Sequence, residues 1–129
     1  MTQEDKELLL KDISARVPYG IKASYYGTEQ ECETWDEIDC VTLDGYVDIG
    51  QYSLPIERFK PYLFPLSSMT EKEWEDYQKI RMIDWVHGDI NGTFINAGLI
   101  VDWLNKNHFD YRGLIDKSLA LDATGLNIY

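Results

Sequence analysis

The stretch TLDGYVDIGQYSLPI, residues 42–56, decides the fold that this sequence predicts. Asp44-Gly45 is a strong signal for a two-residue hairpin turn, because both residue types tolerate the positive φ angles that such turns require. Residues 46–49 form the return strand, which ends at a glycine, and residues 54–56 add one more short strand. The stretch therefore predicts antiparallel strands joined by tight turns.

The residues before this hairpin favour one helix and then further strands. Apolar residues at helical spacing predict a helix over 2–16, with Thr2 as its N-cap and Pro18 at its end. Residues 21–25 alternate with the period of a half-buried strand, and residues 35–43 are strand-like again. The chain therefore begins with a helix and continues into a β-rich part.

The β-rich part covers about residues 18–66. Its short strands and tight turns predict a small antiparallel curled sheet or an SH3-like barrel at about residues 19–57. Residues 57–59 are expected to form a turn or a single helical twist. Residues 61–66 contain two prolines and are expected to form an extended connector, because proline restricts the preceding residue and donates no hydrogen bond.

The second half of the chain is predicted to be helical. Thr70 and Glu73 have the spacing of a capping box, which starts a helix that ends near Gly88. Thr93 is a candidate N-cap for a further helix over residues 94–106, which carries a broad apolar stripe.

Asn107 is a plausible left-handed cap for the end of that helix. The tail at residues 121–129 is too apolar for a solvated arm and is expected to pack back on the domain. The sequence thus predicts one α+β domain over residues 1–129, whose helical part at about 70–121 holds two to three helices.

The net charge of the chain is −11, which argues against direct binding to nucleic acid or to anionic membranes, since both would repel it. The N-terminus has no basic stretch leading into an apolar run, so a secretory signal is not expected. Cys32 and Cys40 form no CxxC motif and are expected to be reduced, partly buried thiols. We therefore expect a cytoplasmic protein.

The acidity is concentrated in one segment. Nine carboxylates and no Lys or Arg occur in residues 23–57. In an extended chain, one face of this segment would hold the six candidate binding residues Glu29, Glu31, Glu33, Trp35, Glu37 and Asp39. Such a face suits a basic protein partner. A solvated loop is the simpler alternative, and the spacing does not follow the EF-hand pattern of a Ca²⁺ site.

A second cluster of polar residues follows the last predicted helix. His108, Asp110 and Arg112 provide a base, a carboxylate and a cation within five residues, which would suit acid–base catalysis if a cleft brought a substrate to them. Local structural roles are the simpler alternative. The two histidines come with no HExxH motif or cysteine pair, so neither a metal site nor a cofactor is predicted.

Two blocks of the sequence resemble a known family. The blocks are IERFKPYLFPLSSMT at residues 56–70, and DWLN at 102–105 followed by HFDYRGLI at 108–115. They are similar to a family of small, uncharacterised acidic proteins from gut-bacterial genomes and from phage-related or mobile regions. The resemblance implies no activity, and the connection around residues 81–97 is longer here than in that family.

Three functional hypotheses follow from these patterns. A non-enzymatic protein-interaction domain is favoured, because the acidic segment lies among aromatic residues of the kind that line recognition grooves, although these residues could equally fill a core. An inhibitor or nucleic-acid mimic of a mobile element would use the same carboxylates in place of phosphates. An enzyme would use His108, Asp110 and Arg112.

Overall fold

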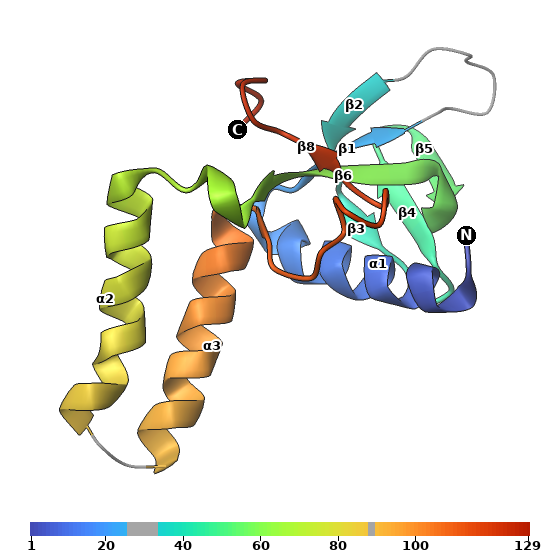
Figure 1. Cartoon of the computed structure of the whole chain (residues 1–129). Helices are drawn as coiled ribbons and strands as arrows, with labels where there is room; N and C mark the ends of the chain where they lie inside the picture. Colours follow the sequence, from blue (N-terminus) through green and yellow to red (C-terminus); the bar gives the residue numbers. More distant parts are fainter. Residues whose placement is uncertain (26–33, 88–89) are drawn as a thin grey trace.

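The computed structural model of the chain describes residues 1–25, 34–87 and 90–129 (Figure 1). It is an α+β structure, as the sequence predicts. Its helices are α1 (Gln3–Arg16), α2 (Glu71–His87) and α3 (Ile90–Lys106), with 3₁₀ turns η1 (Val17–Tyr19), η2 (Ile56–Arg58) and η3 (Leu66–Ser68). Its strands are β1 (Lys22–Tyr25), β2 (Thr34–Glu37), β3 (Cys40–Val41), β4 (Tyr46–Ile49), β5 (Tyr52–Pro55), β6 (Phe59–Pro65), β7 (Phe109–Asp110) and β8 (Leu121–Asp122).

The N-terminal helix α1 starts and ends where the sequence predicts. The Thr2 hydroxyl accepts a hydrogen bond from the Asp5 amide, and the Asp5 carboxylate accepts one from the Thr2 amide, which completes a capping box. The helix ends at Arg16, and Pro18 lies in the 3₁₀ turn that follows. Leu9 and Ile13 are fully buried on the face that packs against the sheets.

The strands form two curled sheets. The first has the order β2-β1-β6-β7, with β8 also paired to β6, and the second has the order β3-β4-β5. The chain bends between β2 and β3: the Ile38 amide donates to the Ile21 carbonyl, and the Asp39 amide donates to the Asp48 carbonyl. The bent segment therefore joins the two sheets, which do not close into one barrel over the described strands.

The predicted hairpin is present, but its turn is longer than two residues. The Thr42 amide donates to the Tyr46 carbonyl across residues 43–45, and Gly45 alone in this turn has a positive φ, of 85°. Glycine adopts this conformation without the steric cost of a Cβ atom. The turn therefore requires Gly45 to be glycine, whereas Asp44 keeps an ordinary backbone conformation.

The hydrophobic core lies between α1 and the two sheets. The core residues come from α1, from β1 and the residue before it, from the later strands and the short segments between them, and from the C-terminal segment. They are Leu9, Ile13, Ile21, Ala23, Tyr25, Ile38, Val47, Ile49, Leu54, Ile56, Phe59, Leu63, Leu114, Leu119 and Ala120. The C-terminal segment thus packs back on the domain, as its apolar composition predicts.

The proline-rich stretch at residues 61–66 corrects one prediction. It is extended, but most of it belongs to β6, a central strand, and is not a connector. Proline is tolerated there because β6 changes partner along its length. It pairs with β1 up to Pro61, with β8 through Tyr62 and Leu63, and with β7 up to Pro65.

Helices α2 and α3 pack on each other as a hairpin that projects from the sheets, as Figure 1 shows. The capping box of α2 is confirmed, since Thr70 and Glu73 exchange two hydrogen bonds of 3.0 and 3.2 Å. Helix α3 begins at Ile90, so Thr93 lies inside it and is not its N-cap. The helical part ends at Lys106, earlier than predicted, and two helices follow the β-rich part within the described chain.

The left-handed residue after α3 is His108, with a φ of 61°, and not Asn107. The Asn107 side chain instead donates to the Trp103 carbonyl at 2.9 Å, which satisfies one of the last carbonyls of the helix. Over the described residues, no helix is both long and apolar enough to cross a membrane.

Candidate functional site

Part of the predicted acidic face lies on β2, which is the edge strand of the first sheet. Trp35 and Glu37 are both exposed on this strand, two residues apart and therefore on the same face. The exposed fraction of Trp35 is 49%, which is large for an aromatic residue in a sheet. Glu29, Glu31 and Glu33 lie outside the described residues.

Asp39 belongs to a different environment from Trp35 and Glu37. Its carboxylate accepts a hydrogen bond of 3.0 Å from the Gly50 amide, and its own amide donates to the Asp48 carbonyl. These bonds hold Asp39 against the turn between β4 and β5. The structure therefore brings Trp35 and Glu37 together and gives Asp39 a role in joining the two sheets.

Lys22 lies beside Trp35, which the sequence pattern did not indicate. Its Nζ atom lies 5.4 Å from the centre of the Trp35 ring and 5.6 Å from the centre of the Tyr129 ring. It also donates to the Ile128 carbonyl. These contacts orient Trp35 by a cation–π interaction and place one positive charge within the predicted acidic face.

The C-terminal residue of the sequence anchors the other side of Lys22. The Tyr129 hydroxyl accepts from the Lys22 amide at 2.9 Å and donates to the Tyr62 carbonyl at 2.8 Å. Burial raises the pKa of the Tyr129 phenol above its ordinary value, so this hydroxyl stays protonated and continues to donate.

The side chain of Glu37 also lies close to the backbone of the turn before β1. Gly20 has a φ of 73°, and a Cβ atom placed there would lie 2.6 Å from a carboxylate oxygen of Glu37. Glycine at this position therefore permits both the left-handed turn and the close approach of the Glu37 side chain.

The three candidate catalytic residues do not converge on one cleft. The Asp110 carboxylate accepts from the amides of Leu114 and Ile115, both at 2.9 Å, and so caps the turn that follows. Arg112 forms an ion pair of 2.8 Å with Asp12 of α1. Asp110 therefore binds backbone amides and Arg112 binds a carboxylate of α1, so both side chains are engaged in separate structural contacts. This geometry gives no support to acid–base catalysis.

His108, the third candidate, is buried and stacks on Tyr129 with the ring centres 3.8 Å apart. Burial, together with the nearby positive charges of Arg16 and Lys22, lowers its pKa to about 4. The ring is therefore neutral at pH 7, and its Nδ1 atom has no hydrogen-bond partner among the described residues.

A buried ion network joins α1 to the segment after β7. The side chains of Asp12 and Arg16 are fully buried, and Arg16 donates to Asp12 at 3.0 and 3.2 Å and to the Phe109 carbonyl at 2.6 Å. Arg112 completes the network through Asp12, and both guanidinium groups lie over the Tyr111 ring. The one sequence signal for this network was the i,i+4 spacing of Asp12 and Arg16 within a predicted amphipathic helix.

The thiols and metal ligands give no further site within the described chain. Cys40 is exposed, whereas the sequence suggested partial burial, and its Sγ donates to the Asp48 carboxylate at 3.1 Å. This hydrogen bond raises the pKa of the Cys40 thiol, which makes it less reactive. Among the described residues, no group of three or more His, Cys, Asp or Glu could hold a metal ion.

Comparison with protein-family models, with curated proteins and with solved structures finds no match to this chain. The resemblance to small phage-related proteins therefore stays a prediction.

Proposed function

We propose that this chain is a non-enzymatic protein-interaction domain that binds a basic segment of a partner protein along β2. The observation that carries the proposal is Trp35, which is 49% exposed on an edge strand beside the exposed carboxylate of Glu37. Tryptophan is enriched among residues that dominate binding energy, and it attracts the guanidinium or ammonium groups of a partner.

The edge position of β2 adds a second reason. An edge strand has backbone groups that an extended segment can pair with, and this mode of recognition takes its specificity from alternate side chains. Trp35 and Glu37 are alternate side chains on β2. A partner strand with a basic residue at the matching position would contact both.

We also propose an SH3-like arrangement for the β-rich part and a cytoplasmic location. The order of the elements supports the first. After β1 and β2, the chain bends into β3, continues through the hairpin strands β4 and β5 and the 3₁₀ turn η2, and returns in β6 beside β1. The free thiol of Cys40 supports the second, because thiols stay reduced in the cytosol.

The test is affinity capture from host lysate at low and at high salt. The bait is compared with Trp35→Ala and with the triple charge reversal Glu31→Lys, Glu33→Lys, Glu37→Lys. A matched control, Glu75→Lys, Asp102→Lys, Asp116→Lys, makes the same change in net charge at exposed positions elsewhere. We expect one protein whose capture falls at high salt and is lost with Trp35→Ala and with the triple charge reversal, but not with the control. Equal capture by all four baits would overturn the proposal.

The inhibitor or nucleic-acid mimic is distinguished in the same experiment. A mimic would capture a nucleic-acid-binding protein, and added duplex DNA would displace it from the bait. A partner that DNA does not displace supports the interaction domain instead.

A further inference from the structure

A groove of about 290 Å³ lies between α1 and the second sheet. In Figure 1, α1 lies below the sheets and β2 lies above them, and no residue of β2 lines the groove. Its volume is at the lower end for small-molecule sites. It therefore suits one or two side chains of a partner better than a cofactor.

The apolar part of the groove is formed by Leu10, Leu43 and Ile56. Leu10 is half-buried on α1 and Ile56 is buried at the start of η2. Leu43 is fully exposed at the tip of the β3–β4 turn. Backbone hydrogen bonds of Thr42, Gly45 and Tyr46 close this turn, so its conformation does not depend on the Leu43 side chain. An exposed leucine beside a partly apolar groove offers surface that a partner could bury.

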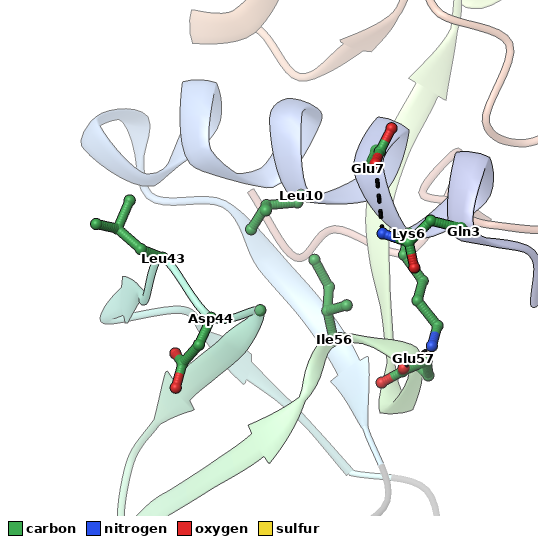
Figure 2. Close-up of a pocket in the computed structure, with 9 residues that line it drawn as sticks. Gln3, Lys6, Glu7, Leu10, Leu43, Asp44, Ile56 and Glu57 are labelled. Carbon is green, nitrogen blue, oxygen red and sulfur yellow. Dashed lines mark hydrogen bonds and ion pairs between the residues drawn. The ribbon is translucent and has the colours of Figure 1, made fainter.

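The charged part of the groove is mainly negative. Three carboxylates, Glu7, Asp44 and Glu57, line it together with one ammonium group, that of Lys6. Figure 2 shows Lys6 and Glu57 at one end of the groove, and Leu43 and Asp44 at the other. Lys6 lies 2.6 Å from Glu57, and this hydrogen bond lowers the pKa of the Glu57 carboxyl, so Glu57 is ionised at pH 7.

The positive charge is thus held at one end, and the end with Leu43 and Asp44 is left apolar and negative. The Asp44 carboxylate accepts a hydrogen bond from the Thr42 hydroxyl, which holds its orientation on the exposed turn beside the groove. Charge complementarity favours a cationic group there, and the three apolar side chains favour an aliphatic group next to it.

We propose that this groove binds a short segment of a partner protein in which an aliphatic residue is adjacent to Lys or Arg. The aliphatic side chain covers Leu10, Leu43 and Ile56, and the basic side chain reaches Asp44. The proposal goes beyond the proposed function, because it assigns a second surface that shares no residue with β2.

The test is a methyl-detected NMR titration of the whole chain with the blocked peptide acetyl-Leu-Lys-Leu-Lys-amide, and with acetyl-Leu-Glu-Leu-Glu-amide as its acidic counterpart. We expect the basic peptide to shift the methyl resonances of Leu10, Leu43 and Ile56, and the shifts to weaken as salt is added. The acidic peptide should leave these methyl groups unchanged.

Two variants connect the shifts to the groove. Leu43→Ala and Asp44→Asn should each weaken binding of the basic peptide by about fivefold or more, the ordinary result of losing one interfacial contact. Both variants should keep the fold, because Leu43 has no buried surface to lose and asparagine suits a turn. Leu126→Ala and Asp116→Asn are matched controls at exposed positions outside the groove, and they should bind as the parent chain does.

Shifts of equal size with the acidic peptide, binding unchanged by Leu43→Ala and Asp44→Asn, or no shift in the groove would overturn the inference. Shifts of the Trp35 indole N–H resonance, followed in the same samples, without shifts in the groove would overturn it and leave the β2 proposal intact. Because the groove variants and the β2 variants are different residues, each proposal can fail without the other.

Discussion

The sheets with α1 and the α2–α3 hairpin differ in which side chains they bury and which they leave exposed. The first region encloses the charged pair Asp12–Arg16 with no exposure of either side chain. The hairpin leaves large apolar residues in solvent, among them Trp74 at 49% and Leu99 at 40% exposed. The comparison indicates that the first region is the cooperative core of the protein, and that the hairpin contributes surface more than stability.

A row of rings connects the two regions. Neighbouring ring centres along it are 3.8 to 6.1 Å apart. The row runs from the hairpin to the C-terminal residue through Trp74, Tyr77, Trp103, Phe109, Phe64, Tyr129 and His108. Trp103 stacks on Phe109 at the base of the hairpin, so this contact is where the hairpin is attached to the first sheet.

The largest loss of stability is expected for Asp12→Ala. It leaves Arg16 buried and Arg112 without their shared carboxylate, and breaking a buried pair costs about 3 to 5 kcal/mol. Urea denaturation measures the loss. Glu57→Gln, in the half-exposed pair with Lys6, is the control and should lose under about 1 kcal/mol. Similar losses in the two variants would contradict the role given to the buried network.

A pair of leucine truncations compares the two regions directly. Leu9→Ala in the fully buried core should cost about 2 to 5 kcal/mol, whereas Leu99→Ala on the exposed side of the hairpin should cost under about 1 kcal/mol. The same denaturation experiment compares them. If Leu99→Ala is as damaging as Leu9→Ala, the hairpin belongs to the cooperative core and the distinction between the regions is wrong.

Removal of the Tyr129 ring should have an intermediate effect. Tyr129→Ala removes the stack on His108 and two hydrogen bonds to the backbone, which should lower the free energy of unfolding by about 2 to 3 kcal/mol. Tyr129→Phe removes the hydrogen bonds alone, which should lower it by about 1 kcal/mol. Hydrogen exchange of the Lys22 amide should accelerate in both variants, because its acceptor is the Tyr129 hydroxyl. Unchanged exchange at Lys22 would show that the C-terminal segment does not pack as described.

The remaining prediction is a pH dependence of stability that comes from His108. Its pKa is about 4 in the folded protein against 6.5 ordinarily, so between these values the unfolded chain binds the extra proton. Stability should therefore fall as the pH drops from 6.5 to 4, by at most about 1.4 kcal/mol per pH unit. His108→Gln should show a shallower fall than the parent over this range. Parallel curves for the two proteins would exclude the contribution of His108.

Local signals in the sequence predicted local structure well. The N-cap at Thr2, the capping box at Thr70 and the stop at Pro18 act within one helical turn, so the residues that decide them are close together in sequence. The prediction for Asn107 was wrong because the alternative depends on tertiary contact: His108 takes the left-handed position with its ring stacked on Tyr129.

The candidate sites show the same limit. Trp35 and Glu37 could be placed on one exposed face from their spacing alone, since alternation along a strand is a local property. The partners of Asp110 and Arg112 could not be predicted in the same way. Arg112 pairs with a carboxylate 100 residues away, and Asp110 binds backbone amides whose positions depend on the following turn.

By itself the sequence determined the fold class, the position of the β3–β4 turn and the concentration of negative charge in residues 23–57, because each depends on neighbouring residues or on composition. Only the tertiary structure decided that residues 59–65 form a central strand, that Lys22 lies between Trp35 and Tyr129, and that Asp12 and Arg16 are buried. These features require segments far apart in the chain to meet. Such meetings are set by the packing of the whole core, which no local pattern records.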